Sequence, residues 1–161
     1  MPTLRRILLA TLVTACAVLV PALPAGGHDE DATLFLGFSL QATGPSTTAG
    51  TFVASGAVSD MGTSTVDELA VVPLGRRDGG RLTGRQVFAG AHGTIVTRFR
   101  GVARYLSRPH QVGEGRVRIV SGTGAYAGLR GRGEFTIVVV TPPAGNTLIG
   151  TEEIEVGDPA R

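Results

Sequence analysis

Short runs of alternating apolar and polar residues dominate the chain from Gly26 onward, and this period of two constrains its fold more than any other feature. Successive side chains of a β-strand point to opposite faces, so each run can bury one face and expose the other. No apolar repeat of 3.6 residues is sustained along the same stretch, as an amphipathic helix would require. The pattern therefore predicts an almost entirely β protein.

Eight runs qualify as strands, and clusters rich in Gly, Pro, Ser or Asp separate them. The predicted strands lie near residues 34–40, 52–58, 66–72, 81–88, 94–106, 116–120, 134–140 and 147–156. We expect turns at 44–46, 60–62, 77–80, 109–110, 142–143 and 146. Eight strands with short, sequential connections predict an antiparallel barrel, which removes the edges of its sheet by closing. A sandwich of two sheets is the alternative.

The first 25 residues have the features of a secretory signal peptide. Arg5 and Arg6 precede an apolar run over 7–20, and the sequence PALPA follows at 21–25. The run has about 14 residues, fewer than the roughly 18 to 20 that a membrane-spanning helix needs. Cys16 lies in a sequence that also resembles the lipobox of bacterial lipoproteins, but the apolar residues after it favour a cleaved signal.

We therefore expect a secreted or extracytoplasmic protein, with a lipid anchor on Cys16 as the alternative. Cleavage is expected near Gly26, followed by a flexible segment over 26–32 and one β-barrel domain over 33–157. No second apolar run of the length that a membrane span needs occurs either. Cleavage also removes Cys16, the only cysteine, and leaves a domain that packing and hydrogen bonds alone stabilise.

The basic character of the chain belongs to the signal. All 15 basic residues are Arg, and removal of Arg5 and Arg6 leaves 13, which equals the 13 Asp and Glu. Nonspecific binding to nucleic acids depends on basic residues that neutralise phosphates. A domain with no net charge therefore gives no reason to expect a nucleic-acid partner.

A glycine-rich segment over 122–133, GTGAYAGLRGRG, separates two predicted strands. It matches the dinucleotide fingerprint G-x-G-x-x-A, but its later glycines would break the helix which that fingerprint requires. We instead expect a tight turn beneath the barrel, in which Tyr126 and Leu129 plug the barrel end. A positive φ is expected for at least one of Gly122, Gly124 and Gly128.

The same segment, with the apolar strand over 135–140, resembles the late glycine-rich motif of the allene oxide cyclase and dirigent barrel superfamily. The likeness includes GTFVASG at 50–56 and GAHGTI at 90–95, covers roughly 50–140, and is greatest to exported bacterial members. The resemblance implies an eight-stranded, calycin-like barrel, commonly a homotrimer. It also implies an apolar lumen that holds a hydrophobic small molecule.

Alternation assigns the more apolar face of each strand to the lumen. In the longest run, Phe99 and Tyr105 share that face with Ile95. Aromatic side chains bury much apolar ligand surface, so the aromatic residues on this face are the candidates for binding. The residues expected to contact a hydrophobic small molecule are Phe38, Phe52, Phe99, Tyr105 and Phe135.

The opposite face of the longest run carries arginines, and glutamates of the last strand could form ion pairs with them. The arginines are Arg98, Arg100 and Arg104, with Arg116 and Arg118 on the next strand, and the glutamates are Glu153 and Glu155. An exposed ladder of ion pairs, each worth well under ~1 kcal/mol, accounts for this pattern most simply. The alternative is a surface that docks an anion or a polysaccharide.

Residues with catalytic or metal-binding spacing are scarce. His92 and His110 lie far apart in the chain, and neither has a second His or Cys at ligand spacing, so we expect no metal and no cofactor. His92 is expected to bond to the backbone beside a turn. No G-x-S-x-G nucleophile motif is present. Asp67 and Glu68 are neighbours in a predicted strand, which would turn one of them toward the lumen.

These observations favour an exported barrel that binds a hydrophobic small molecule. One alternative is an isomerase or cyclase that accelerates its reaction by positioning a lipid-like substrate. The other is a structural protein of the cell envelope. An open apolar lumen would favour binding, a buried carboxylate would favour an enzyme, and a lumen filled by side chains would favour the structural role.

Overall fold

The computed structural model describes residues 32–75, 79–107, 110–140 and 146–157. The predicted signal peptide and residues 26–31 of the predicted N-terminal segment lie outside these ranges. The strands are β1 (Ala32–Ala42), β2 (Thr48–Gly56), β3 (Asp60–Val66), β4 (Ala70–Pro73), β5 (Gly80–Gly90), β6 (Gly93–Ser107), β7 (His110–Gly122), β8 (Arg130–Val140) and β9 (Thr147–Gly157). A single 3₁₀ turn, η1 (Gly124–Tyr126), is the only helical element among the described residues.

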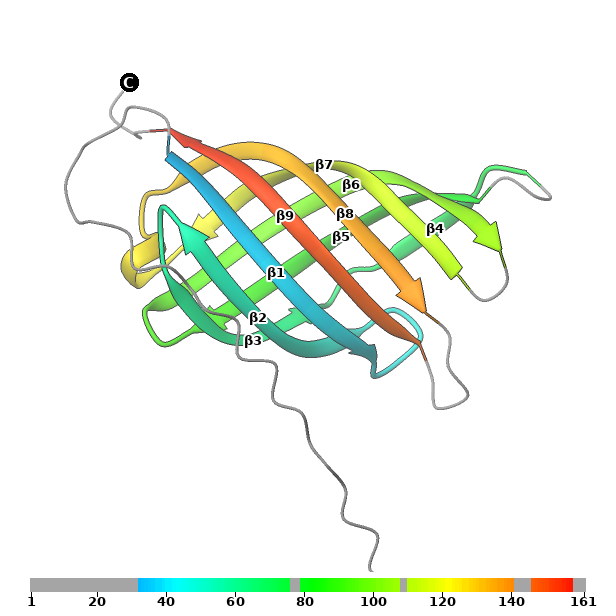
Figure 1. The fold of residues 1–161 in the computed structure, drawn as a ribbon, viewed down its shortest axis with the longest axis horizontal. Coiled ribbons are helices and arrows are strands. Elements are labelled where there is room, and N and C mark those ends of the chain that lie inside the picture. The colour runs from blue at the N-terminus through cyan, green and yellow to red at the C-terminus, as the bar shows by residue number, and fades with distance from the viewer. Residues whose placement is uncertain (1–31, 76–78, 108–109, 141–145, 158–161) are drawn as a thin grey trace, which may run out of the picture.

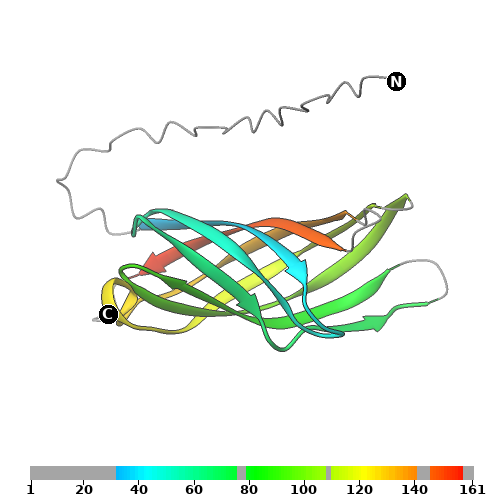
Figure 2. The same cartoon turned by 90° about the horizontal axis from the view of Figure 1, so that it is seen from below.

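The strands form one antiparallel sheet that closes on itself. Its order is β3-β2-β1-β9-β8-β7-β6-β5-β4, and a further pairing of β3 with β5 completes a ring of eight strands. The first and last strands of the ring in the sequence, β1 and β9, lie side by side (Figure 1). A view turned by 90° shows strands on both sides of the interior (Figure 2). The predicted eight-stranded antiparallel barrel is confirmed.

The ninth strand, β4, results from a break that alternation did not reveal. The predicted strand over 66–72 is divided, because residues 67–69 leave the sheet before β4 pairs with the start of β5. Two backbone bonds hold this loop: Asp67 N donates to Arg85 O at 3.2 Å, and Leu69 N donates to Ser46 O at 3.3 Å. The prediction of one continuous strand was therefore wrong.

The predicted turn over 60–62 was also wrong. These residues begin β3, and the chain turns earlier, after Gly56 with its φ of 87°. Ala57 N donates to Thr33 O at 2.9 Å and fixes that turn against β1. Asp60 follows in extended backbone and points inward, where its carboxylate accepts hydrogen bonds.

Alternate side chains of the ring strands point inward and form a single apolar core. On β1, for example, Leu34, Leu36 and Leu40 are all at most 1% exposed. On β6 the inward residues include Ile95 and Phe99, whereas Arg98, Arg100 and Arg104 are exposed. The predicted register of this longest strand is therefore confirmed.

Inward-facing glycines make room for the aromatic rings of neighbouring strands. Gly84 pairs with Phe99, and a methyl group on Gly84 would lie 2.2 Å from Cζ of that ring. Gly115 pairs with Phe135 in the same way, with 2.9 Å to its Cε1. The rings thus occupy the space that side chains would otherwise fill, and they pack on each other with centroids 5.3 Å apart.

The glycine-rich segment closes one end of the barrel, as predicted. Tyr126 is fully buried in the core, and Leu129 packs against the core while partly exposed. Gly124 has a φ of 58° and Gly128 a φ of 80°, whereas Gly122 has no positive φ. Ala125 N donates to His92 O at 2.8 Å, which holds the segment against the turn between β5 and β6.

We expect Gly124→Val to lower the free energy of unfolding by at least about 2 kcal/mol, because a β-branched residue is strained at positive φ. Its Cβ would also lie only 2.1 Å from the carbonyl oxygen of His92. Urea unfolding measures the change. Gly37→Val is the control, since its Cβ would approach nothing closer than 4.0 Å. Equal losses in the two variants would contradict the assigned role of Gly124.

Candidate functional site

A carboxyl group lies inside the barrel, and the strand pairing of β9 places it there. Leu148, Glu152 and Ile154 alternate inward along β9, while Glu153 and Glu155 point outward. Glu152 is only 1% exposed. Its Oε1 accepts a hydrogen bond of 3.1 Å from the Thr97 hydroxyl, and its Oε2 has no partner among the described atoms.

The surroundings of Glu152 favour its neutral form. Burial raises the pKa of this carboxyl from 4.5 to about 8, and the hydrogen bond from Thr97 opposes the rise only in part. At neutral pH Glu152 is therefore mainly a carboxylic acid. A neutral carboxyl can donate one hydrogen bond through its O–H and can also accept hydrogen bonds. Within the described structure, Oε2 makes neither kind of bond.

A small cavity adjoins Glu152. Its volume is about 20 Å³, which suffices for one water molecule, since a water needs roughly 10–15 Å³ measured in this way. Three aromatic rings and several aliphatic side chains form its wall, and Gln86 is its other polar neighbour. The amide of Gln86 already donates to Ser64 Oγ at 2.9 Å. The apolar wall includes Phe38, Phe99, Phe135, Leu40, Leu69 and Leu148.

Of the five aromatic residues predicted to line the lumen, only some border the cavity beside Glu152. Phe38, Phe99 and Phe135 border the cavity beside Glu152. Phe52 is buried but lies away from the cavity, with its ring 5.2 Å from that of Phe88. The side chain of Tyr105 lies outside the described part of the structure. That these residues bind a ligand stays a prediction.

Sequence reasoning missed Glu152 and looked for an inward carboxylate in the wrong segment. Asp67 and Glu68 are both exposed, because they lie in the loop before β4 and not in a strand. Asp67 forms an ion pair with Arg85 instead. The alternation of β9 did indicate Glu152, because it lies an even number of residues from Leu148 and Ile154, which point inward.

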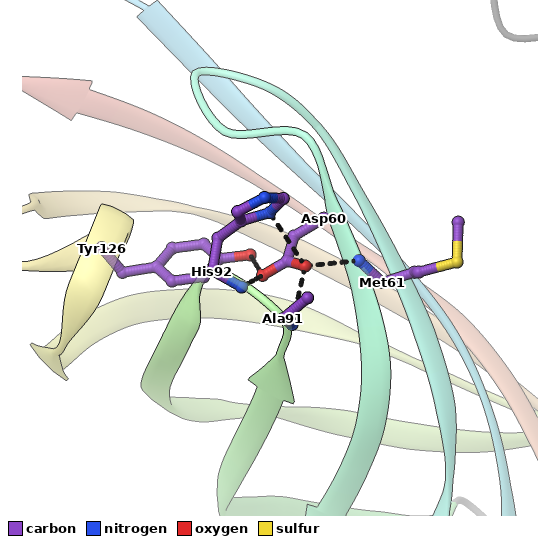
Figure 3. A network of polar contacts seen from close by, with 5 residues as sticks. All are labelled: Asp60, Met61, Ala91, His92 and Tyr126. Carbon is purple, nitrogen blue, oxygen red and sulfur yellow. Dashed lines mark hydrogen bonds and ion pairs between the residues drawn. The ribbon is translucent and has the colours of Figure 1, made fainter.

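A second buried carboxylate, Asp60, lies at the plugged end of the barrel (Figure 3). Its Oδ1 accepts from Met61 N at 2.8 Å and from Ala91 N at 3.0 Å. Its Oδ2 accepts from His92 N and from the Tyr126 hydroxyl, each at 3.2 Å. Asp60 thus joins β3, the turn between β5 and β6, and the plug.

Hydrogen bonding keeps Asp60 ionised. Burial raises the pKa of this carboxyl, but the donors from Met61, His92, Tyr126 and Ala91 together lower it below the usual 3.8. The imidazole of His92 is mostly exposed, with Nδ1 3.3 Å from Oδ1. The ring of His92 was expected to bond to backbone, and instead it lies at ion-pair distance from a carboxylate. The acceptor capacity of Asp60 serves structural donors, so this cluster offers no free base for catalysis.

No group of three His, Cys, Asp or Glu side chains in the described ranges is arranged to hold a metal ion. The side chain of His110 is not among the described side chains. The same residues contain no helix of the length and apolarity needed to cross a membrane. Comparisons with protein-family models, curated proteins and solved structures find no match.

Proposed function

We propose that this protein is an exported barrel that binds a small, mainly apolar molecule in its lumen through Glu152. The observation that carries the proposal is a nearly fully buried carboxyl oxygen, without a partner among the described atoms, beside an apolar cavity. An unpaired buried polar atom costs free energy, which a ligand oxygen would recover. Membership of the allene oxide cyclase and dirigent superfamily belongs to the same proposal and rests on the sequence resemblance.

The chemistry of the cavity defines the class of ligand. Its wall is apolar, so the ligand buries a hydrocarbon surface against Phe38, Phe99 and Phe135. The neutral carboxyl of Glu152 can donate to one hydroxyl or carbonyl oxygen, or accept from one hydroxyl. A fatty alcohol or an apolar ketone meets both requirements.

Binding requires side chains to move, because the cavity of about 20 Å³ is far smaller than the roughly 300–1,000 Å³ of a ligand pocket. Leu69 is the side chain best placed to move. It borders the cavity from the short loop between β3 and β4 and is only partly buried. Displacement of Leu69 would extend the cavity toward the end of the barrel that the plug does not close.

Titration with 1-octanol and with octane, followed by NMR, tests this proposal. We expect wild-type protein to bind octanol more tightly than octane, and Leu69→Ala to bind both more tightly than wild type. Phe99→Arg should abolish binding, because it places an unpaired charge in the cavity wall at a cost of several kcal/mol. Phe52→Leu is the control for an altered aromatic residue away from the cavity. The absence of saturable binding to both wild type and Leu69→Ala would refute the proposal.

A second candidate, an isomerase or cyclase, is favoured by the burial of the Glu152 carboxyl, the feature expected of an enzyme, and by its raised pKa. A carboxyl that titrates near neutral pH is suited to general acid catalysis. An enzyme would convert a reactive lipid-like substrate to one product and lose that selectivity in Glu152→Gln. The third candidate, a structural envelope protein, is favoured by the close packing of the lumen, and predicts no octanol binding in any variant.

A further inference from the structure

The outer face of β6, β7 and β8 carries a block of five arginines in direct cross-strand register. Arg98 pairs with Arg118, which pairs in turn with Arg132 on the next strand. Arg100 and Arg116 form a second pair two residues further along their strands. All five side chains are exposed. We refer to these residues as the arginine block.

The arginine block lines a groove of about 1040 Å³ on the outside of the barrel. Glutamates border the block, with Glu134 on β8 and Glu153 and Glu155 on β9. The strand register places Glu155 opposite Arg132, and Glu134 opposite Arg116. Glu68, from the loop before β4, lines the opposite side, so the groove has cations along its middle and carboxylates on both sides.

Most of these guanidinium groups lack an ion pair. Among the described residues, only Arg98 of the block has a carboxylate oxygen within 4.0 Å, at 3.6 Å from Glu68. The predicted ladder of ion pairs to Glu153 and Glu155 is therefore absent at that distance within these residues. Like charges directly opposite each other destabilise a sheet, so the arrangement costs stability that a bound anion would restore.

We propose that this groove binds an acidic polysaccharide, a linear chain of sugars that each bear a carboxylate. Neighbouring strands are about 4.8 Å apart, so the row of Arg98, Arg118 and Arg132 presents one guanidinium per strand spacing. This interval is close to the length of one sugar ring along a glycan. Guanidinium groups pair with carboxylates through two parallel hydrogen bonds.

The glutamates favour a polysaccharide over other polyanions. Glu134, Glu153 and Glu155 can accept hydrogen bonds from sugar hydroxyls, which an acidic glycan carries beside its carboxylates. A nucleic acid has a denser row of negative charges and few free hydroxyls, so these glutamates would repel it more than a glycan whose carboxylates are separated by neutral hydroxyls. An acidic peptide offers carboxylates but lacks hydroxyls for this side of the groove.

The test measures binding of polygalacturonate to the full protein by calorimetry at about 0.15 M salt, with dextran as the neutral glycan. We expect saturable binding of polygalacturonate and none of dextran. The double variant Arg116→Gln/Arg118→Gln should weaken the binding of polygalacturonate at least tenfold, because roughly two charge-assisted contacts are lost. The matched control Arg81→Gln/Arg130→Gln removes the same charge from exposed residues outside the groove and should bind like wild type.

Circular dichroism and thermal melting establish that both double variants fold, as exposed positions should allow. Equal binding by the groove variant and wild type would overturn the proposal, as would equal weakening in the control variant. Tighter binding of poly-glutamate or single-stranded DNA than of polygalacturonate would overturn the choice of partner. Octanol binding in the lumen is a separate measurement, so the two proposals fail independently.

Discussion

Glu152→Gln should stabilise the protein by roughly 5 kcal/mol at pH 9 and by less than about 1 kcal/mol at pH 5. The pKa of Glu152 is about 8 in the folded state and near 4.5 when unfolded, a difference of about 5 kcal/mol at 1.36 kcal/mol per pKa unit. Because the folded-state pKa is the higher one, the folded protein binds more protons between these values. Wild-type stability is therefore full below pH 4.5 and is lost as pH rises toward 8.

Urea unfolding of both proteins at pH 5, 7 and 9 measures this effect. The free energy of unfolding should fall steeply with pH in the wild type, and the curve of Glu152→Gln should lack this component. Asp60 does not disturb the comparison, because its lowered pKa keeps it ionised throughout this range. Glu153→Gln is the matched control, since this neighbour points outward and is exposed. Parallel curves for wild type and Glu152→Gln would refute the assignment of a neutral buried acid.

Asp60→Ala should lower the free energy of unfolding by about 4 kcal/mol or more. Three backbone N–H groups in partly buried bonds and the buried Tyr126 hydroxyl would lose their acceptor at once. A buried donor left unsatisfied costs about 1–3 kcal/mol, and we expect about 1 kcal/mol for each partly buried one. The contribution of Asp60 is present above pH 3.8 and is lost as pH falls through its lowered folded-state pKa. Urea unfolding at pH 7 gives the size of the effect.

Two further variants separate the parts of this cluster. Tyr126→Phe removes one donor and keeps the ring in the core, so its cost should be about 1 kcal/mol. Asp60→Asn keeps one acceptor oxygen without the charge and should lie between the other two. A cost for Asp60→Ala no larger than that for Tyr126→Phe would mean that Asp60 does not join the three segments.

Alternation predicted the barrel well where one face of a strand is uniformly apolar. On β1 and β6 the pattern identified the inward residues correctly, including Phe38 and Phe99. It also located the plug at Tyr126, because so many glycines demand an unusual backbone. It failed at the break between β3 and β4, where backbone bonds to Arg85 and Ser46 decide the path of the chain.

The two buried carboxylates explain why the candidate site was harder to predict. Charged residues are rarely buried, so Glu152 was overlooked although its parity placed it inside. Asp60 was assigned to a turn because aspartate is common in turns. Three of its four hydrogen-bond donors lie about 30 or 66 positions away in the sequence. Such long-range hydrogen bonds leave no local pattern that a reader of one sequence can recognise.

The plug has a consequence for how a ligand could reach the interior of the barrel. Tyr126 and Asp60 seal one end with a web of hydrogen bonds, whereas Leu40, Leu69 and Leu148 border the cavity from the opposite side. Within the described residues the plug thus closes one end of the interior, and these leucines lie toward the other end. The ligand proposed for Glu152 would then enter and leave past the leucines, with its oxygen atom held deeper in the barrel than its hydrocarbon chain. Its rate of exchange would depend on how fast these side chains move aside.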